Sequence, residues 1–278
     1  MKAERAKLEE GPICPSGLIM APTRELCQQI AHEARRLTFR TELRVCALYG
    51  GANEGPQLRR MLEGCDIAVC TPGRLNDYLN LGLISAARTR YLILDEADRM
   101  LDMGFKPQIT NIVKSRGMPP PGDPAEGGRV SMMFSATFPK DVQKAAQAYM
   151  DPRYFWCAVG RVGAAASNVE QLFLDVRLKK KKTDPEPDPH VQSRLKLEKV
   201  LEALETVKQR LQGESGSDAT KTIVFLNAKS RAARIAKELT DEGVDARALH
   251  GDLPQAHRDR AVKDLRDGRC SVLVATDV

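Results

Sequence analysis

Short, mostly apolar runs alternate with amphipathic stretches over the first 160 residues of the chain. The apolar runs lie at 18–21, 45–49, 67–70, 91–94, 130–134 and 155–159. Patterns of helical period lie between them, for example at 24–37 and 140–149. Alternating strands and helices are typical of βαβ units, and continuous apolar runs are typical of strands buried on both faces of a parallel sheet. We therefore predict an α/β fold with a parallel sheet.

Small, hydroxyl or charged residues follow the first five of these predicted strands. The segments are Pro22-Thr23-Arg24-Glu25-Leu26, Gly50-Gly51, Thr71-Pro72-Gly73-Arg74-Leu75, Asp95-Glu96-Ala97-Asp98 and Ser135-Ala136-Thr137. Successive parallel strands joined by right-handed crossovers open on one edge of the sheet, which is where ligands bind in such folds. One turn of this kind would be ordinary, but five in order indicate an active edge.

The acidic segment after residues 91–94 suits a nucleotide site. One carboxylate, Asp95, can hold Mg²⁺ on the phosphates, and its neighbour Glu96 can orient an attacking water. The alternative is a helix N-terminus whose acidic residues interact with the helix dipole. The other four segments favour the catalytic interpretation.

The alternation breaks at residues 160–190 and resumes further along the chain. The break holds a small-residue stretch at 163–167, four lysines at 179–182 and a segment rich in Asp and Pro at 183–189. We interpret these as a linker and a solvated loop, with phosphate contact by the lysines as the less favoured alternative. A helical pattern at 195–211 and a linker-like stretch at 213–219 follow. Strands are then predicted at 222–226, 246–250 and 271–275, with helices at 230–242 and 256–265, so we expect a second, truncated α/β domain.

Composition narrows the class of protein. The net charge of +6 is as compatible with a polyanionic partner as with an ordinary basic protein. The seven cysteines form no C-x-x-C pair, so we expect reduced thiols. None of the four histidines has a partner at metal-ligand spacing, so we expect no zinc site. No apolar run is long enough for a membrane span, and residues 1–10 are charged rather than signal-like. We expect an intracellular protein, cytoplasmic or nuclear or both, without a membrane partner.

The five segments, in this order and spacing, closely resemble the first-domain motifs of the DEAD-box RNA helicases. His250-Gly251-Asp252, Gln255 with Arg258, and residues 272–277 resemble that family's second-domain motifs. Residues 95–105 (DEADRMLDMGF), 133–139 (MFSATFP) and 158–163 (AVGRVG) resemble the Vasa-type branch. The resemblance covers residues 18–278.

The resemblance implies tandem RecA-like domains with parallel sheets, the first without its N-terminal part and the second truncated at its C-terminus. It places an N-terminal extension at 1–17, a partial helicase ATP-binding domain at 18–160, a linker at 161–194 and a partial helicase C-terminal domain at 195–278. The implied activity is ATP-dependent RNA unwinding or remodelling, in which ATP hydrolysis is coupled to closure of the two domains on single-stranded RNA.

The implied ligands are ATP, Mg²⁺ and RNA. The resemblance also implies a role for each residue that matches a motif of the family. Asp95 would reach Mg²⁺, and Glu96 would position the hydrolytic water. Asp98 would pair with Ser135 and Thr137 and couple the nucleotide state to RNA engagement; for these last two residues the alternative is helix capping. The implied RNA-binding residues are Pro22, Thr23, Arg24, Gly51, Thr71, Pro72, Gly73, Arg74, Gly251, Asp252 and Thr276.

These RNA-binding residues suit phosphates and sugars rather than base edges. Backbone amides, hydroxyls and arginines bind the phosphates and sugars of the RNA without contacting base edges, so we expect low sequence specificity. For Arg24 and Arg74 the alternative is a structural ion pair. No particular protein partner is implied.

The chain departs from the family pattern in its ATP site. We find no phosphate loop of the form G-x-x-x-x-G-K-[ST]. The candidate Lys221-Thr222 does not fit, because it follows Thr220 where the loop requires a glycine. The adenine-reading glutamine motif and the final arginine-rich motif are also not found. An arginine finger alone is worth about 10³–10⁵ in rate. We therefore expect that residues 1–278, as written, do not hydrolyse ATP at a useful rate.

Two hypotheses follow. The chain is a piece of an ATP-dependent RNA helicase, or it is a truncated, non-hydrolysing RNA-binding protein. The intact Asp95, Glu96, Ser135 and Thr137 favour the first hypothesis. A DNA helicase of the same superfamily is a weaker alternative, because the S-A-T and P-T-R-E-L segments point to RNA.

Overall fold

The computed structural model of the protein describes residues 11–160, 169–176, 189–215 and 221–276. The chain divides into two compact units, Met1–Ser167 and Asn168–Val278. No helix among the described residues is long and apolar enough to cross a membrane. The predicted small-residue linker at 163–167, the four lysines at 179–182 and most of the Asp/Pro segment lie outside the described residues.

The first unit contains a parallel five-stranded sheet in the order β2-β3-β1-β4-β5. Its strands are β1 (Gly17–Met20), β2 (Val45–Leu48), β3 (Ile67–Cys70), β4 (Tyr91–Leu94) and β5 (Val130–Met133). Its helices are α2 (Arg24–Leu37), α3 (Glu54–Leu62), α4 (Pro72–Asn80), α5 (Ala97–Asp102), α6 (Lys106–Ser115), the 3₁₀ turn η1 (Pro124–Glu126) and α7 (Lys140–Tyr149). The predicted α/β fold with a parallel sheet is confirmed.

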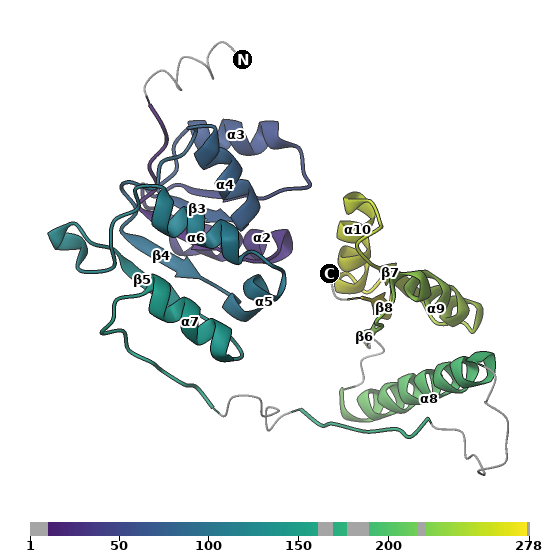
Figure 1. Ribbon diagram of the computed structural model, residues 1–278. Coiled ribbons are helices and arrows are strands. Elements are labelled where there is room, and N and C mark those ends of the chain that lie inside the picture. The colour runs from purple at the N-terminus through teal and green to yellow at the C-terminus, as the bar shows by residue number, and fades with distance from the viewer. Residues whose placement is uncertain (1–10, 161–168, 177–188, 216–220, 277–278) are drawn as a thin grey trace. The chain divides into compact units, whose positions relative to one another are not determined.

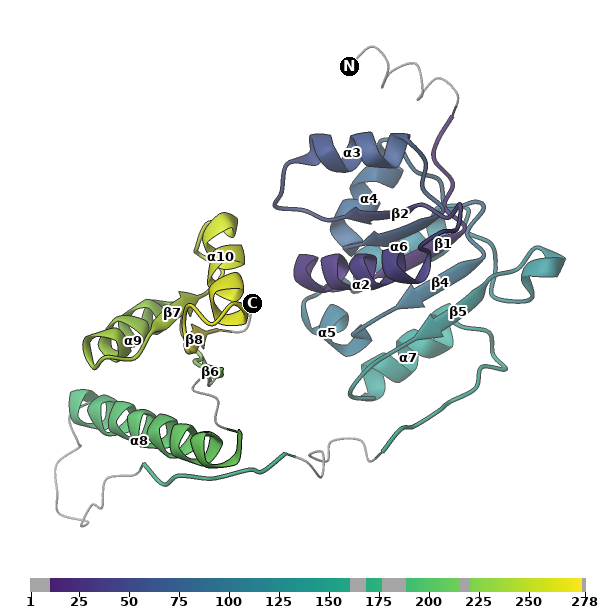
Figure 2. The ribbon, with the colours of Figure 1, turned by 180° about the vertical axis from the view of Figure 1, so that it is seen from behind.

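The two faces of this sheet are covered differently. Alternate strand residues such as Leu18 and Leu92 pack with side chains from α3 to α7 in the larger core cluster. On the opposite face, α2 packs its buried Cys27 and Ala31 against the β2–β3 side of the sheet. Figures 1 and 2 show α4 and α6 on one side of the sheet and α2 on the other.

This uneven cover corrects one expectation, the burial of β4 on both of its faces. Tyr91 is 47% exposed, so β4 is not buried on both faces. Tyr91 lies on the same face as Ile19, where α2 contacts β2 and β3 and leaves the β4–β5 side open among the described residues.

The predicted strand at 155–159 is irregular instead. No neighbouring strand pairs with it among the described residues, and Phe155 and Val159 are each 97% exposed. Within the segment the Trp156 ring meets the Phe138 ring edge to face at 4.3 Å. Apolar residues alone do not make a strand without a partner to complete the backbone hydrogen bonds.

The second unit contains a parallel three-stranded sheet in the order β6-β8-β7. Its elements are α8 (Pro189–Ser215), β6 (Thr222–Phe225), α9 (Lys229–Asp241), β7 (Ala246–Leu249), α10 (Gln255–Arg266) and β8 (Val272–Ala275). Val272 and Val274 of the central strand pack with Leu239 of α9 in one core cluster. The predicted alternation in this half of the chain is therefore present.

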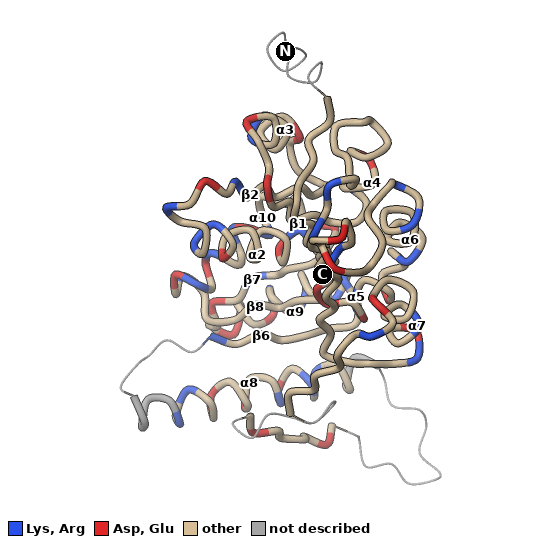
Figure 3. Tube along the Cα trace, turned by 90° about the vertical axis from the view of Figure 1, so that its left-hand side faces the viewer, with Lys and Arg blue, Asp and Glu red and all other residues tan. Residues whose placement is uncertain are grey.

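Helix α8 begins at Pro189, within the stretch that we expected to be a linker, and ends at Ser215 within the linker-like stretch. Proline is tolerated in the first turn of a helix because its missing N–H has no helical partner there. The helix carries both signs of charge along its length (Figure 3), including the i,i+4 ion pair of Arg194 with Glu198 at 3.3 Å.

Candidate functional site

The five motif segments of the first unit lie along one edge of its sheet. The last residues of the five strands are register partners in the order Leu48, Cys70, Met20, Leu94 and Met133. Because each segment begins one or two residues after one of these strand ends, the fold brings all five segments to the same edge. The predicted common edge is therefore present in the structure, and its activity stays a prediction.

The acidic segment turns sharply out of β4. The Asp95 N–H donates to the Met20 carbonyl oxygen at 3.0 Å, and the Ala97 N–H donates to that of Phe134, also at 3.0 Å. Glu96 between them has φ 51° and ψ 51°, the left-handed conformation that non-glycine residues rarely adopt. Its side chain makes no cap hydrogen bond to α5. The acidic segment does lie at a helix N-terminus, with Glu96 as the N-cap of α5 and Asp98 in its first turn, so the alternative of an interaction with the helix dipole also fits this geometry. The left-handed backbone of Glu96 is in addition typical of functional sites.

Asp98 is the centre of a hydrogen-bonded link between two motif segments. Its Oδ2 accepts from Thr137 Oγ1 at 2.6 Å and from the Thr137 N–H at 3.1 Å, and its Oδ1 accepts from the Arg99 N–H at 3.0 Å. Its own N–H donates to Ser135 Oγ at 3.2 Å. Asp98 is only 8% exposed. The pairing of Asp98 with Ser135 and Thr137 is thus present in the geometry.

The alternative for Ser135 and Thr137, capping of the following helix, is not what the structure shows. Helix α7 begins at Lys140 with Pro139 at its N-cap position and has no side-chain cap. Ser135 instead satisfies the Asp98 N–H in the first turn of α5. The hydroxyls therefore join two segments rather than end one helix.

The hydrogen bonds to Asp98 determine its protonation. Burial alone would raise the pKa of its carboxyl, but hydrogen bonds from Thr137 and from the Arg99 backbone favour the charged form and hold the pKa below its ordinary value. A carboxyl whose pKa is lowered by folding stabilises the protein above its unfolded pKa, about 3.9 for Asp, and loses that contribution as the pH falls through the folded value.

We therefore expect a pH-dependent cost of Thr137→Val, a change that keeps the shape and removes the hydroxyl. At pH 6 the lost hydrogen bond to a charged acceptor lowers the free energy of unfolding by about 1.5–3 kcal/mol. As the pH falls through the folded pKa of Asp98, which lies below its ordinary value, the acceptor is neutralised, and the cost falls by roughly half because neutral hydrogen bonds are weaker. Urea denaturation followed by fluorescence of Trp156, the single tryptophan, measures both. A cost that is the same at pH 6 and pH 3 would show that Thr137 does not act through the Asp98 charge.

A second group of contacts joins Arg24 to the glycine segment. Arg24 Nη1 donates to the Gly51 carbonyl oxygen at 3.1 Å, and its guanidinium lies 5.5 Å from the Tyr49 ring centroid. The Tyr49 hydroxyl accepts from Gln28 Nε2 at 2.6 Å. Thr23 is the N-cap of α2, where its Oγ1 accepts from the Leu26 N–H at 3.2 Å.

Arg74 is held by a partner from another helix. Its Nη1 forms a short ion pair with Glu54 in the first turn of α3, and its guanidinium lies 5.4 Å from the Tyr78 ring centroid. The side chains of Arg24 and Arg74 are each only 12% exposed. The structural ion pair that we considered as the alternative is thus present for Arg74, and Arg24 also has one, with its Nε 3.8 Å from Glu25 Oε1. Phosphate contact by both arginines stays a prediction.

The other predicted residues of this edge frame the start of α4. Thr71 is its N-cap in extended conformation without a side-chain cap bond, and Pro72 occupies its first turn. No atom lies within 4 Å of where a Cβ would stand on Gly73, so the backbone there is open to a ligand. Pro22, by contrast, is buried.

The second unit brings its predicted residues to the ends of β7 and β8. Leu249 and Ala275 are register partners, so His250-Gly251-Asp252 and Thr276 start side by side. Asp252 pairs with Lys229 Nζ at 2.9 Å, and this hydrogen bond lowers the pKa of Asp252. Asp277 lies outside the described residues.

Buried polar atoms without partners mark the same edge of the second unit. Both ring nitrogens of His250 and the Thr276 Oγ1 have no hydrogen-bond partner among the residues that the structure describes, and the two residues are 9% and 5% exposed. Buried polar groups are normally satisfied, so these atoms are candidates for contact with a ligand.

Sequence reasoning did not single out Tyr49, Glu54 or Lys229. Lys229 could have been noticed in the sequence, because it lies in the first turn of a helix, where a positive charge interacts unfavourably with the helix dipole. Such a position suggests that the lysine has another role. Tyr49 and Glu54 flank the Gly50-Gly51 turn, but their partners on α2 and α4 become apparent only in the fold.

Comparison with known proteins agrees with this geometry. Residues 5–145 match the model of the DEAD/DEAH box helicase family, and residues 196–278 match that of the helicase conserved C-terminal domain. Similar solved structures include S. cerevisiae Dbp5 L327V bound to RNA and ADP BeF3, with a TM-score of 0.71 and 24% identity over 99% of this chain and 61% of that one. S. cerevisiae Dbp5 bound to RNA and ADP BeF3 matches with a TM-score of 0.71 and 24% identity over 96% of this chain and 59% of that one.

The chain thus spans about three fifths of the length of these structures. At this identity the likeness shows the fold, which is that of tandem RecA-like helicase domains and confirms the predicted fold class. The family itself is shown by the model that covers half of the chain and contains all five first-unit motifs. The chain belongs to the DEAD/DEAH box helicase family.

Proposed function

We propose that the chain is part of an ATP-dependent RNA helicase of the Vasa-type branch, which couples ATP hydrolysis to closure of its two RecA-like domains on single-stranded RNA. The observation that carries the proposal is the link from Asp98 to Ser135 and Thr137. It ties the acidic segment after β4 to the S-A-T segment after β5. A change of nucleotide at Asp95 and Glu96 can therefore be transmitted to the neighbouring segment.

The acidic segment fits a magnesium–nucleotide site. Asp95 and Glu96 are half-buried at the sheet edge, and Asp95 Oδ1 accepts from the Glu96 N–H at 3.0 Å, which fixes the carboxylate. Carboxylate oxygens are the protein ligands that Mg²⁺ prefers when it also binds phosphates. In the proposed site Asp95 holds Mg²⁺, Glu96 orients the attacking water, and ATP supplies the phosphoanhydride bond that is cleaved.

The RNA surface that we propose for the first unit is made by the turns at the sheet edge. The open backbone at Gly73 and the strand-end threonines Thr23 and Thr71 can approach phosphates closely. Arg24 and Arg74 supply positive charge, and Arg74 would exchange Glu54 for a phosphate. In the second unit we propose Gly251, Asp252 and Thr276 as further RNA contacts. Contacts of this kind bind RNA with little sequence preference.

The product of the complete open reading frame tests the proposal. We expect RNA to stimulate its ATP hydrolysis and expect Glu96→Gln to lower kcat by roughly 10²-fold or more, because water positioning and general-base groups contribute 10²–10⁴. Nucleotide affinity, measured with a fluorescent ATP analogue, should change little, since Gln keeps the shape and Asp95 keeps the metal.

Glu33→Gln serves as the matched control, because Glu33 is an exposed glutamate on α2 that pairs with Arg36. It should leave both measurements unchanged. Undiminished ATP turnover in the Glu96→Gln protein would show that Glu96 does not take part in the proposed reaction.

The second candidate is a non-hydrolysing RNA-binding protein, which the lack of a G-x-x-x-x-G-K-[ST] sequence in these 278 residues favours. Sequencing the full-length message through both ends decides between the two. A phosphate loop upstream and an arginine-rich motif downstream support the helicase. A message that begins near Met1 and stops after Val278 supports the non-hydrolysing protein, for which RNA-stimulated turnover should be undetectable.

A further inference from the structure

The turn between β2 and α3 contacts both arginines that we propose as RNA contacts of the first unit. Its Gly51 carbonyl oxygen accepts from Arg24 Nη1 at 3.1 Å. At the end of the turn Glu54, the first residue of α3, forms a short ion pair with Nη1 of Arg74 from α4. The two contacts differ in charge, because a carbonyl oxygen is neutral and a carboxylate carries a full negative charge. Glu54 therefore neutralises the charge of Arg74.

The two partners of this ion pair differ in their exposure. The Arg74 side chain is 12% exposed, and its guanidinium lies 5.4 Å from the centroid of the Tyr78 ring. The Glu54 side chain is 58% exposed. The carboxylate is thus the part of the pair that solvent and a dissolved ligand reach most readily.

The start of α3 does not depend on the Glu54 carboxylate. The N-cap of the helix is Asn53, whose Oδ1 accepts from the Gly55 N–H at 3.0 Å. A carboxylate in the first turn also interacts favourably with the helix dipole, but this contribution is small at an exposed position. Glutamine can therefore replace Glu54 while α3 stays intact.

An RNA phosphate that binds Arg74 has to compete with this carboxylate. Either the phosphate takes the guanidinium and Glu54 gives up its ion pair, or the two anions share the guanidinium and repel each other at close range. Both arrangements make RNA binding less favourable than it would be at an arginine without an acidic partner. Because Glu54 belongs to the same chain, its effective concentration at Arg74 does not depend on the amount of RNA.

We propose that Glu54 acts as an intramolecular competitor of RNA at Arg74 and lowers the affinity of the candidate edge for single-stranded RNA. This inference rests on the proposed function, in which Arg74 contacts an RNA phosphate. It assigns to Glu54, which itself makes no favourable contact with RNA, a part in determining how tightly the strand is bound.

RNA binding by the product of the complete open reading frame tests the inference. Fluorescence anisotropy of a short labelled oligouridine gives the dissociation constant, with Mg²⁺ and a non-hydrolysable ATP analogue present. We expect Glu54→Gln to bind this RNA about 2–5-fold more tightly than the parent, which is the range for a partly exposed ion pair. The gain should shrink as the salt concentration rises, because screening weakens the competing ion pair.

Glu63→Gln is the matched control. Glu63 is an exposed glutamate at the other end of α3, and its replacement changes the net charge by the same amount. We expect the control to bind RNA like the parent, and each variant is used only if its far-UV circular dichroism matches that of the parent. An unchanged dissociation constant in Glu54→Gln, or an equal gain in both variants, would overturn the inference.

A double-variant cycle shows whether Glu54 acts through Arg74. Arg74→Gln should weaken RNA binding, and the further change Glu54→Gln should then bring no gain. The same gain with and without Arg74 would mean that Glu54 only repels RNA from a distance, which would overturn the inference and leave Arg74 as an RNA contact. If Arg74→Gln alone leaves RNA binding unchanged, the proposed RNA contact of Arg74 is wrong, and the inference fails with it. The comparison of Glu54→Gln with Glu63→Gln stands even if Arg74→Gln does not fold.

Discussion

Asp98→Ala lowers the free energy of unfolding of the first unit by about 3 kcal/mol, the largest effect that we expect from a single site substitution. The carboxylate accepts three hydrogen bonds, two from Thr137 and one from the Arg99 N–H. Bonds to a charged group contribute about 1.5–3 kcal/mol each, and truncation also leaves the Thr137 donors without their acceptor. Because the contributions in one network are not additive, the expected total is well below their sum.

Trp156 fluorescence during urea denaturation measures this loss in the first unit, to which the single tryptophan belongs. Asp102→Ala is the matched control, since Asp102 is an exposed aspartate in the same helix α5. Its substitution should change stability by no more than about 0.5 kcal/mol. Equal effects of the two substitutions would show that the Asp98 network adds no stability and that its role is confined to coupling.

Local signals allowed helix boundaries to be predicted from the sequence. Helices α2 and α7 span the residues that the periodicity indicated, Arg24–Leu37 and Lys140–Tyr149. Thr23 carries a hydroxyl that caps α2, and a cap of this type can be read directly from the chain. Strands β2 and β5 end one residue before their apolar runs do, because Tyr49 and Phe134 continue the apolar pattern but no longer pair with a neighbouring strand.

Partnerships between distant segments could not be predicted in the same way. The order of the motifs predicted that the five strand ends would share an edge, and the register shows that they do. The Glu54–Arg74 ion pair joins the first turns of two separate helices, and no sequence pattern specifies it. For the same reason the run at 155–159 looked like a strand: its residues favour the extended form, but pairing depends on a neighbour.

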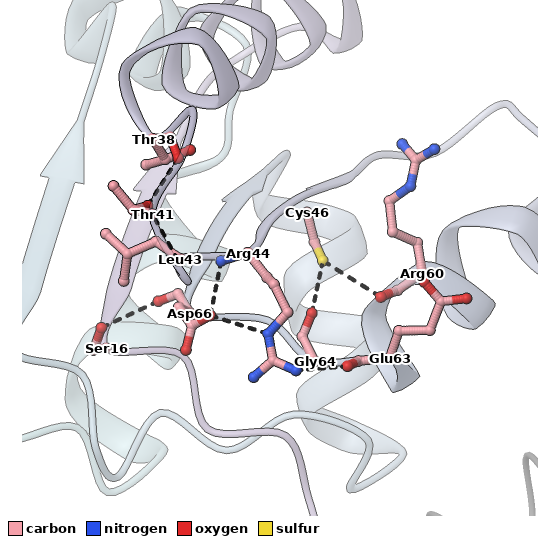
Figure 4. A network of polar contacts seen from close by, with 10 residues as sticks. All are labelled: Ser16, Thr38, Thr41, Leu43, Arg44, Cys46, Arg60, Glu63, Gly64 and Asp66. Carbon is pink, nitrogen blue, oxygen red and sulfur yellow. Dashed lines mark hydrogen bonds and ion pairs between the residues drawn. The ribbon is translucent and has the colours of Figure 1, made fainter.

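Gly64→Ala should be the second largest destabilisation, about 2–3 kcal/mol. Gly64 follows α3 with φ +126°, a conformation that costs an L-residue on the order of 1–3 kcal/mol. A Cβ there would also stand 1.9 Å from Arg44 Nη1. That guanidinium holds the turn, with Nη1 donating to the Glu63 carbonyl oxygen at 2.7 Å and Nε to Asp66 Oδ2 at 3.2 Å (Figure 4).

Two controls separate the strain in the backbone from the clash with Arg44. Gly82 has φ +68° with no atom within 4 Å of its Cβ position, so Gly82→Ala reports the backbone cost alone, about 1–2 kcal/mol. Arg44→Ala should cost less than about 1 kcal/mol, because the side chain is 57% exposed. In the Gly64→Ala background it should cost nothing further, since the contacts of Arg44 are already broken. If the effects of the two substitutions on the free energy of unfolding are strictly additive, Arg44 moves aside without losing its contact with Asp66. The whole destabilisation by Gly64→Ala then lies in the backbone of Gly64.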